Sequence, residues 1–564
     1  MNSILENEFP PLNSCHSLET FFQNELVFFH FHTARFFNNK EEHLFTKRYC
    51  HVLSTLKKYA NSSYDFIDRY FDLFYHLVIQ TRSIRHGKGE HTLSYLMVYS
   101  WYEFFPETAI KMIHQFTHGS HGSWRDIKYL CQYCKDTSTL DSEHPLILTC
   151  IDIINNQLKQ DLYTWNFSQH PRDRNYISNS AKWIPREKKQ HDWLFKKLVV
   201  HWVHMKNPHI LSTPTTHTSY IKAIHKASRL FRKDVSFLNK ILETTEINQC
   251  SHTINNINPN TTSAITISKQ KNTFFGLSDK TITDEQSIAC KTNFERSFYS
   301  KLHNTTTTHT NPRIFTPLPI HYYVKEAISL SQLKDTHDTR TQIQVLNHQW
   351  KLLSLSFSSN SFQHTIPIID TTCQDSRIDT LFSSIAFSIM IAQHNKIHNR
   401  IFLLGQKHNW ISFDNIHHFT DIVTYIYKHI EPVFDLSIHS LFKQIGQTFI
   451  HSSSQKQHNH LRFVFFSTFS HSFYNNIPGI YFHEYISNIL QQYRFYKPII
   501  AYWNVSNDFN DFLPCKFNDY NTMLLSGFSI PLLHILKSFP KHKIQNPFET
   551  VSHILTHTTL LEST

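Results

Sequence analysis

The sequence predicts a multidomain protein in which an all-α helical repeat is followed by a doubly wound α/β domain. Apolar residues recur at three- and four-residue intervals from about Glu19 to Lys240, as amphipathic helices require. From about Phe362 onward, short apolar runs alternate with helix-like segments, which is the pattern of a parallel sheet covered by helices. At 564 residues, the chain is also too long for one ordinary domain.

Helical periodicity is clearest in FIDRYFDLFYHLVIQT, HTLSYLMVYSWYEFF and AIKMIHQF. Pro106, Pro145, Pro171 and Pro185 fall between such segments, where proline ends one helix or begins the next. Many helices joined by short turns predict a repeat array, because no single helix pair buries its apolar face alone. We place this domain at residues 15–345.

A polar stretch at about residues 244–312 interrupts the helical domain. It is rich in Thr and Asn, as in HNTTTTHTNP, and has few long apolar periods. We expect a surface insertion or a partly ordered connection. Packing of this stretch against the helical core is the open alternative.

The α/β domain is placed at residues 362–540. The predicted strands are HTIPIID, RIFLLG, LRFVFFS, KPIIAYWNV and TMLLSG. The predicted helices between them are LFSSIAFSIMIAQHN, DIVTYIYKHI, LFKQIG and HEYISNILQQYRF. Strands alternating with amphipathic helices indicate a parallel, doubly wound sheet.

Composition favours a folded, cytoplasmic protein. The hydrophobic fraction of 40% and the aromatic fraction of 14% can build cores. The nine cysteines are scattered, which fits reduced thiols. The first residues do not resemble a signal peptide, and no stretch of 18 apolar residues occurs. We therefore expect no membrane partner.

The formal net charge of +11 is concentrated in one segment. Between Pro171 and Lys240 there are 15 Lys and Arg against four Asp and Glu, and the rest of the chain is balanced. Lys and Arg that neutralise phosphates give affinity for RNA of any sequence. The candidate RNA contacts in this segment are Lys182, Arg186, Lys188, Lys189, Lys196, Lys197, Lys226 and Arg229.

Aromatic residues are interleaved with these charges and favour the same function, because aromatic rings stack on unpaired bases. They are Trp183, Trp193, Trp202, Tyr220 and Phe231. The alternative is that the charges form the solvated face of helices and the aromatic residues the buried face. Exposed histidines would add charge below about pH 6, so RNA affinity is expected to rise on mild acidification. The histidines concerned are His191, His201, His204 and His225.

The stretch RSIRHGKGEHTLS places two of the chain's nine glycines on either side of Lys88. A phosphate-binding P-loop would need a preceding strand and a Lys-Ser or Lys-Thr pair. Here the flanks are helical and Gly89 follows the lysine. The pattern therefore predicts a corner between two helices, where glycine permits a positive φ. Arg82, Arg85 and Lys88 are candidate RNA contacts at this corner.

Two further motifs have ordinary structural explanations. In GSHGSWRDIKYL, Ser123 can cap a helix and Asp126 can complement its dipole. Arg125 is then free to contact a neighbouring helix or RNA. Cys131 and Cys134 form a CxxC pair, but structural zinc needs a second ligand pair, and the nearest candidates, His144 and Cys150, are unconventionally spaced. The two cysteines are therefore predicted to be core thiols on one helix face.

The segment IPIIDTTCQDS lies at the carboxyl end of the first predicted strand, where ligands bind in open α/β sheets. Asp370, Thr372 and Gln374 present alternate side chains there, and an oxygen-rich cluster of this kind can hold Mg²⁺. One firm carboxylate among three side chains is a poor ligand set for a hard cation.

Several segments, taken in order, resemble a known family. TRSIRHGKGEHTLSYLMVYSWYEFFPETA, HGSWRDIKYL and YISNSAKWIPREKKQHD resemble the helical module of Ro-like, or TROVE, proteins. IIAYWNVSNDF and MLLSGFSIPLLHILKS resemble the last strands and helix of the uncharacterised family that joins such a module to a von Willebrand factor A-like domain. The likeness spans roughly residues 65–540.

The resemblance implies a HEAT-like array of helix pairs followed by an A-like domain. In Ro proteins the array binds single-stranded and structured RNA, which makes the basic segment and the RHGKGE corner candidate RNA surfaces. An A domain's metal site normally has the pattern Asp-x-Ser-x-Ser. Since this chain has Thr372 and Gln374 after Asp370, the resemblance implies a degenerate site at Asp370 and Thr372 that holds no metal.

The sequence thus predicts a non-enzymatic, RNA-binding protein with a degenerate A domain that docks a partner. The alternative is a protein-interaction scaffold that acts through the A domain and does not bind RNA. Rising salt would weaken RNA binding steeply, whereas it would spare a mostly apolar contact. An enzyme is disfavoured, because the chain lacks the acidic cluster that two-metal chemistry needs. We therefore predict no catalytic residue and no cofactor.

Overall fold

The structure is a computed structural model of the chain. It describes residues 15–35, 39–118, 121–167, 175–275, 285–303, 318–358, 361–371, 378–395, 399–405, 409–430, 438–450, 461–469, 482–492, 498–506, 509, 512–538 and 546–560. The chain divides into two compact units. We call residues 1–100 with 317–564 the sheet unit, and residues 101–316 the helical unit.

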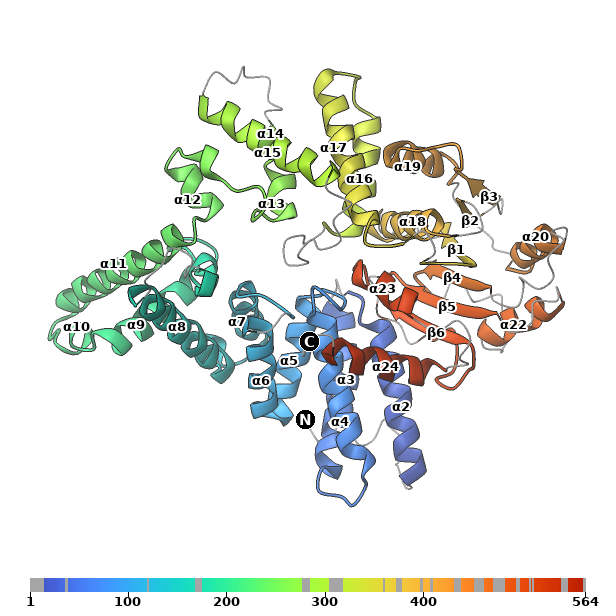
Figure 1. Ribbon diagram of the computed structural model, residues 1–564. Coiled ribbons are helices and arrows are strands. Elements are labelled where there is room, and N and C mark those ends of the chain that lie inside the picture. The colour runs from blue at the N-terminus through green and yellow to red at the C-terminus, as the bar shows by residue number, and fades with distance from the viewer. Residues whose placement is uncertain are drawn as a thin grey trace. The chain divides into compact units, whose positions relative to one another are not determined.

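The sheet unit is built on six strands in the order β3-β2-β1-β4-β5-β6 (Figure 1). The strands are β1 (Thr365–Asp370), β2 (Arg400–Leu404), β3 (Asn409–Ser412), β4 (Arg462–Ser467), β5 (Ile499–Asn504) and β6 (Thr522–Ser526). Neighbouring strands are parallel except β2 and β3, which are antiparallel. All five predicted strands are confirmed, but the prediction of a wholly parallel sheet is wrong. The sheet is mixed, because the short edge strand β3 returns beside β2.

Helices of the sheet unit come from both ends of the chain. The C-terminal ones are α16 (Ile320–Ser331), α17 (His337–Ser354), α18 (Ile378–Gln393), α19 (Phe419–Lys428), α20 (Ile438–Ile450), α22 (Phe482–Gln492), α23 (Pro531–Ser538) and α24 (Pro547–Leu560). The N-terminal ones are α2 (Cys15–His32), α3 (Asn39–Tyr59), α4 (Phe66–Arg82) and the beginning of α5 (Thr92–Phe104). The four helices predicted between the strands are confirmed as α18, α19, α20 and α22.

The N-terminal helices pack on the same body as the sheet. Helix α2 contacts β6 and α24, and α4 also contacts α24. This grouping differs from the predicted division at 15–345 and 362–540, since the first hundred residues cluster with the strands. The core beneath β4 and β5 is aromatic: the rings of Phe387 and Trp503 lie 4.6 Å apart, and those of Phe466 and Trp503 5.2 Å apart.

The helical unit contains no strand in its described residues. Its longer helices are α6 (Pro106–His118), α7 (Arg125–Thr137), α8 (Pro145–Asn166), α9 (Asp192–Lys206), α11 (His217–Ile241) and α15 (Glu285–His303). Short ones are α10 (His209–Ser212), α12 (Thr245–Cys250), α13 (Ala264–Lys269) and α14 (Lys271–Phe275), with the 3-10 turns η1 (Asp141–Glu143), η3 (Ala181–Trp183) and η4 (Ile254–Asn256). Successive helices pack in pairs, α7 on α8, α8 on α9 and α9 on α11.

The described prolines lie between helices as predicted, whereas the polar stretch contains helices of its own. Pro106 and Pro145 begin α6 and α8, and Pro185 lies between η3 and α9, while Pro171 is outside the described residues. The described parts of residues 244–312 form α12 to α15, and α14 packs on α15 through the stacked rings of Phe274 and Phe294. The described part of the stretch is therefore a series of helices joined by short turns. Within those parts of the chain, no helix is long and apolar enough to cross a membrane.

Candidate nucleic-acid interface and sheet edge

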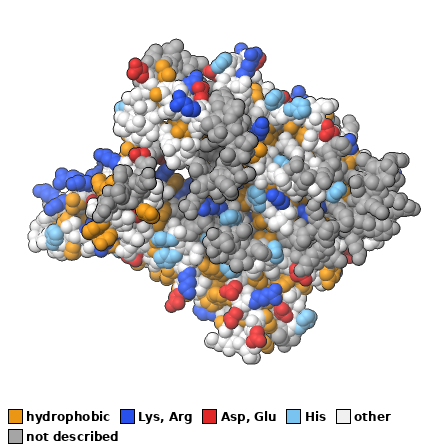
Figure 2. All heavy atoms as spheres, viewed as in Figure 1, with side chains coloured by type: hydrophobic (Ala, Val, Ile, Leu, Met, Phe, Trp, Pro, Cys, Tyr) orange, Lys and Arg blue, Asp and Glu red, His pale blue; other side chains and the backbone are white. Residues whose placement is uncertain are grey.

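Helix α11 carries a row of cations on its outer face. We call this row the α11 ridge, and its members are Lys222, Lys226, Arg229, Lys233 and Lys240, all exposed. At 3.6 residues per turn they lie within about 40° of one another's mean direction around the helix axis. The opposite face is buried through Ala227, Phe231 and Leu238. Figure 2 shows Lys and Arg side chains gathered along this helix.

Three carboxylates of the helical unit, one on α11 and two at or just before the start of α9, pair with cations that are not in the ridge. Glu187 pairs with Arg232 at 2.7 Å, and Asp234 pairs with Lys206 at 3.1 Å. Asp192 pairs with Lys196 at 2.6 Å. Among the described residues, no ion pair involves a member of the α11 ridge. The ridge is therefore an exposed row of uncompensated positive charge.

The segment before α9 adds cations beside α11. Lys182, Arg186, Lys188 and Lys189 are all exposed. Two contacts attach this segment to α11: the Arg232–Glu187 ion pair, and a 3.1 Å hydrogen bond that the Asn239 side chain donates to the carbonyl oxygen of Ala181. These predicted contacts thus belong to a segment that packs against α11, the helix that carries Lys226 and Arg229.

Three predicted RNA contacts have partners within the helical unit. The ion pair with Asp192 occupies Lys196, and Lys197 pairs with Glu143 at 2.5 Å. Arg125 is half-buried, with its guanidinium carbon 4.8 Å from the ring centre of Tyr129 and 5.8 Å from that of Trp183. Arg125 thus contacts the neighbouring η3 turn through Trp183. Its contact with RNA stays a prediction.

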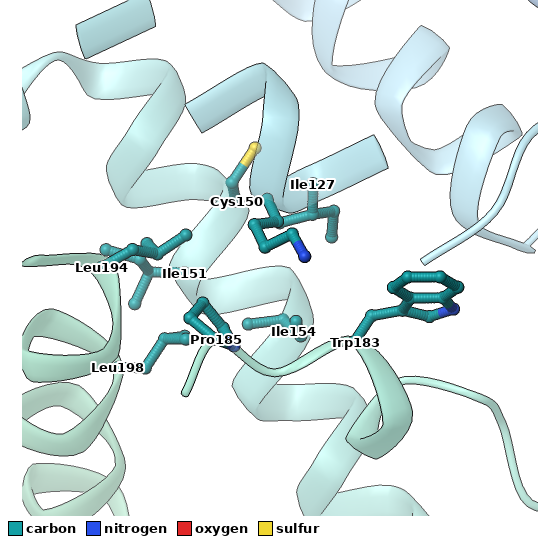
Figure 3. A pocket seen from close by; sticks show the side chains of 9 residues that line it. Ile127, Cys150, Ile151, Ile154, Trp183, Pro185, Leu194 and Leu198 are labelled. Atoms are coloured by element: carbon teal, nitrogen blue, oxygen red, sulfur yellow. The ribbon is translucent and has the colours of Figure 1, made fainter. Parts of the chain in front are cut away.

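An apolar hollow lies behind this surface, between α7, α8 and α9 (Figure 3). Its lining includes Ile127, Ile154, Trp183, Pro185 and Leu198. It has no room for a water molecule. This hollow is therefore too small to hold a ligand, and it adds no binding pocket to the candidate interface.

The aromatic residues of the basic segment divide between core and surface. Trp202 and Phe231 are fully buried, so for these two the interpretation as the inner helix face is correct. Trp183 and Trp193 are half-buried, and the indole N–H of Trp193 donates to Gln132 at 2.9 Å. Tyr220 is exposed.

Two of the four histidines expected to be exposed are not. Burial, and next the charge of Lys128, lowers the pKa of His191. Burial also lowers the pKa of His201 against the opposing effect of Asp152. The burial of these two rings therefore opposes the expected gain of positive charge on mild acidification, whereas His204 and His225 are exposed.

The GKG corner joins α4 to α5 in the sheet unit, as predicted. A Cβ on Gly87 would lie only 1.9 Å from the carbonyl oxygen of Gln80. Gly89 has a φ of +71°, a conformation that glycine adopts without strain. The backbone N–H groups of Lys88 and Glu90 donate to the carbonyl oxygens of Gln80 and Thr81, each at 2.9 Å. One glycine thus permits a close approach and the other a left-handed turn.

The side chain at the centre of this corner is buried. The Nζ atom of Lys88 donates to the carbonyl oxygen of His30 at 2.5 Å, to Thr33 Oγ1 at 2.5 Å and to Ser526 Oγ at 2.6 Å. Burial lowers the pKa of Lys88, and the Glu90 carboxylate opposes this effect. Three acceptors match the three N–H bonds of the charged ammonium. The prediction that Lys88 contacts RNA does not fit this geometry.

The other two cations of the corner differ from each other. Arg82 is fully buried, so it also cannot reach a phosphate from this position, whereas Arg85 is exposed. Of these three cations, only Arg85 therefore stays a candidate RNA contact. All three belong to the sheet unit.

Lys88 belongs to a cluster that fills part of the sheet's carboxyl edge. Ser526 ends β6 and donates its hydroxyl to the carbonyl oxygen of His30 at 2.6 Å. Asn504 ends β5 and donates its side-chain amide to the carbonyl oxygen of Phe31 at 3.0 Å. The carboxyl end of α2 thus occupies the edge at β5 and β6, where a ligand would bind in an open α/β sheet.

The predicted metal site lies at the carboxyl end of the neighbouring strands. Asp370 is 4% exposed, and its Oδ2 accepts a hydrogen bond from Ser467 Oγ at 2.6 Å. Thr372 and Gln374 are outside the described residues. No group of three or more His, Cys, Asp or Glu in the described parts of the chain could hold a metal ion. Asp370 and Ser467 alone do not make up a site for a hard cation.

The CxxC pair lies in a helix interior. Cys131 and Cys134 are fully buried on α7, and Cys150 on α8 is buried beside them. Burial raises the pKa of both CxxC thiols. His144, a candidate for the second ligand pair, instead caps α8 by accepting the N–H of Leu146 at 3.2 Å. The arrangement agrees with the predicted core thiols.

The start of α7 differs in detail from its prediction. The Ser123 side chain makes no cap; Asp126 Oδ2 accepts the N–H of Ser123 at 2.7 Å instead. The helix begins at Arg125, two residues after the predicted cap, and Trp124 occupies the N-cap position.

Sequence reasoning missed part of both sites. Lys222, Lys233 and Lys240 were not among the predicted contacts, although their spacing from Lys226 and Arg229 places them on one helix face. No local signal indicates that Ser526 and the carbonyl oxygen of His30 surround Lys88, because these residues are 438 and 58 positions away.

No protein-family model matches the chain, and no curated protein matches it. The resemblance to TROVE proteins and to A-like domains therefore stays a prediction.

Proposed function

We propose that this protein binds RNA without catalysing a reaction, and that the helical unit carries the binding surface. The observation that supports the proposal is the α11 ridge, where exposed cations stand in a row and pair with no carboxylate of the described residues. Like charges four residues apart, such as Lys222 and Lys226, destabilise a helix by about 0.2–0.5 kcal/mol per pair. A bound polyanion relieves that repulsion and releases counterions from its own phosphates.

The sheet unit has a different role in this proposal. Its carboxyl edge at β5 and β6 is filled by the end of α2, and Asp370 is held by Ser467. We propose that this unit is a metal-free structural domain that docks a protein partner, as a degenerate A-like domain would. The mixed sheet and the helix pairs are compatible with the predicted relation to TROVE proteins.

The proposal is tested with the full chain and a mixed pool of single-stranded and stem-loop RNA across a salt series. The ridge variant combines Lys222→Glu, Lys226→Glu, Arg229→Glu and Lys233→Glu. Its matched control makes the same charge change at exposed lysines of the sheet unit. These control changes are Lys57→Glu, Lys325→Glu, Lys334→Glu and Lys351→Glu. Lys196 and Lys197 are left unchanged because their replacement would also break ion pairs.

We expect the wild-type affinity to fall about 50-fold between 50 and 200 mM salt, if four phosphates of a single strand are neutralised. The ridge variant should lose most of this binding, and the control should keep it. Circular dichroism and thermal unfolding of both variants verify that they fold. Wild-type protein that does not bind RNA, or ridge and control variants that bind equally well, would favour the scaffold hypothesis.

A further inference from the structure

An exposed aromatic ring lies beside the α11 ridge. Phe237 is 42% exposed. It follows Lys233 by four residues and precedes Lys240 by three, so both cations neighbour it on the helix surface. Around the axis it lies about 60° from Lys222 and thus borders the cationic row.

This ring differs from the other phenylalanine of α11, which packs in the core. Phe231, on the inner face of the same helix, packs against Phe195 and Trp202 with ring centres 5.7 and 5.8 Å away. Phe237 makes no such ring contact with any described residue. Since 42% of its surface is exposed and no described ring stacks on it, this side chain can receive a planar group from outside the protein.

We infer that Phe237 and the ridge form a binding site for single-stranded RNA. Phe237 stacks on one unpaired base, while Lys233 and Lys240 hold the phosphates on either side. This inference rests on the proposed function and narrows its ligand from RNA in general to the single strand. It also assigns a stacking residue that the charge pattern alone does not indicate.

Shape favours the single strand over a duplex. A helix surface is convex, and the ridge from Lys222 to Lys240 extends about 27 Å at 1.5 Å per residue. A duplex is also convex and keeps its bases stacked inside, so it meets such a ridge over a short length and offers no base to Phe237. A flexible single strand can follow the whole ridge and turn a base onto the ring.

The test compares a short oligouridylate with an RNA duplex of equal length, using the full-length protein. Phe237→Ala removes the ring, Phe237→Trp keeps a stacking surface, and Tyr220→Ala is the matched control. Tyr220 is 44% exposed on the same helix, and it lies about 160° around the axis from Lys222.

We expect Phe237→Ala to weaken oligouridylate binding by about 5- to 150-fold, the range for losing one stacked base. Duplex binding and the salt dependence of oligouridylate binding should not change, because no charge is removed. Phe237→Trp and Tyr220→Ala should bind as the wild type does.

Two results would overturn the inference while the proposed function stands. One is an unchanged oligouridylate affinity in Phe237→Ala while the ridge variant loses binding. The other is an equal loss of duplex and oligouridylate affinity in Phe237→Ala. If the ridge variant itself binds oligouridylate like the wild type, both the inference and the proposed function fail.

Discussion

The GKG corner and the α11 ridge carry the same kind of cation in opposite surroundings. The ammonium of Lys88 is buried and meets three oxygen acceptors of its own chain, on α2, on β6 and just after α2. Lys226 on the ridge is exposed, and water solvates it. At the corner, protein oxygens replace the water that a buried charge has lost. The atoms around a lysine therefore decide whether it has a structural or a binding role.

The largest effect is expected at the corner. Lys88→Met should lower the free energy of unfolding by about 3–5 kcal/mol, because three buried acceptors lose a charged donor. Lys226→Met makes the same change at the surface and should alter stability by less than about 0.5 kcal/mol. Urea unfolding of both variants measures the difference. Equal stabilities would show that the cluster around Lys88 does not hold α2 on the sheet.

Substitutions at the two glycines of the corner should lower stability by different amounts. Gly87→Ala should cost at least about 3 kcal/mol, because the new Cβ would collide with the backbone oxygen of Gln80. Gly89→Ala should cost only about 1–2 kcal/mol: its φ is +71°, but the space beside it is open. Thermal or urea unfolding ranks the two variants. A reversed order would mean that the corner is not as tight as described.

Mild acid should lower the stability of the protein at the carboxyl end of α2, where His32 lies. Burial, and next the Arg48 charge, lowers the pKa of His32 to about 3. As the pH falls, His32 is protonated in the unfolded chain before it is protonated in the folded protein. The stability contributed by the neutral ring is therefore complete above about pH 6.5 and is lost as the pH falls toward 3. Between pH 7 and 5 this one ring should cost about 2 kcal/mol. His32 lies 4.5 Å from Phe28 in an aromatic cluster, so His32→Phe should flatten this part of the stability profile. An unchanged profile in that variant would exclude His32 as its source.

The smallest expected effect is a single ridge cation. Lys226→Met should reduce the slope of log affinity against log salt by roughly 0.7–1, the contribution of one phosphate contact. Arg85→Met is the control at the corner, because it removes the one exposed cation there. Fluorescence anisotropy across a salt series measures both slopes. A larger change for Arg85→Met than for Lys226→Met would move the proposed RNA contact to the sheet unit.

Local pattern was sufficient for most elements of the fold. The runs at β1, β2, β4, β5 and β6 are apolar and nearly continuous, because both faces of a parallel strand are covered. The edge strand β3 was missed, since among its four residues only Ile411 is buried and such a short run has no strand signature. The division into units was also missed, because it follows from α2 and α4 packing on α24 at the far end of the chain.

For the candidate sites, the same limit appears residue by residue. The charge excess of the segment and the helical period place Lys226 and Arg229 on one face of α11. Both the charge excess and the period can be read from the sequence alone. Whether a cation on such a face has a partner is decided by other elements, as when Glu143 pairs with Lys197 across 54 positions.

The sequence by itself determined the helices and strands, the corner at Gly87 and Gly89, and the location of the excess charge. These depend on periodicity and backbone conformation within a few neighbouring residues. Only the tertiary structure decided that Lys88 is buried and hydrogen-bonded within the protein. It also decided that the cations of the α11 ridge pair with no carboxylate of the described residues. The physical reason is that burial and hydrogen bonding are set by contacts between distant segments, and those contacts leave no periodic trace in either segment.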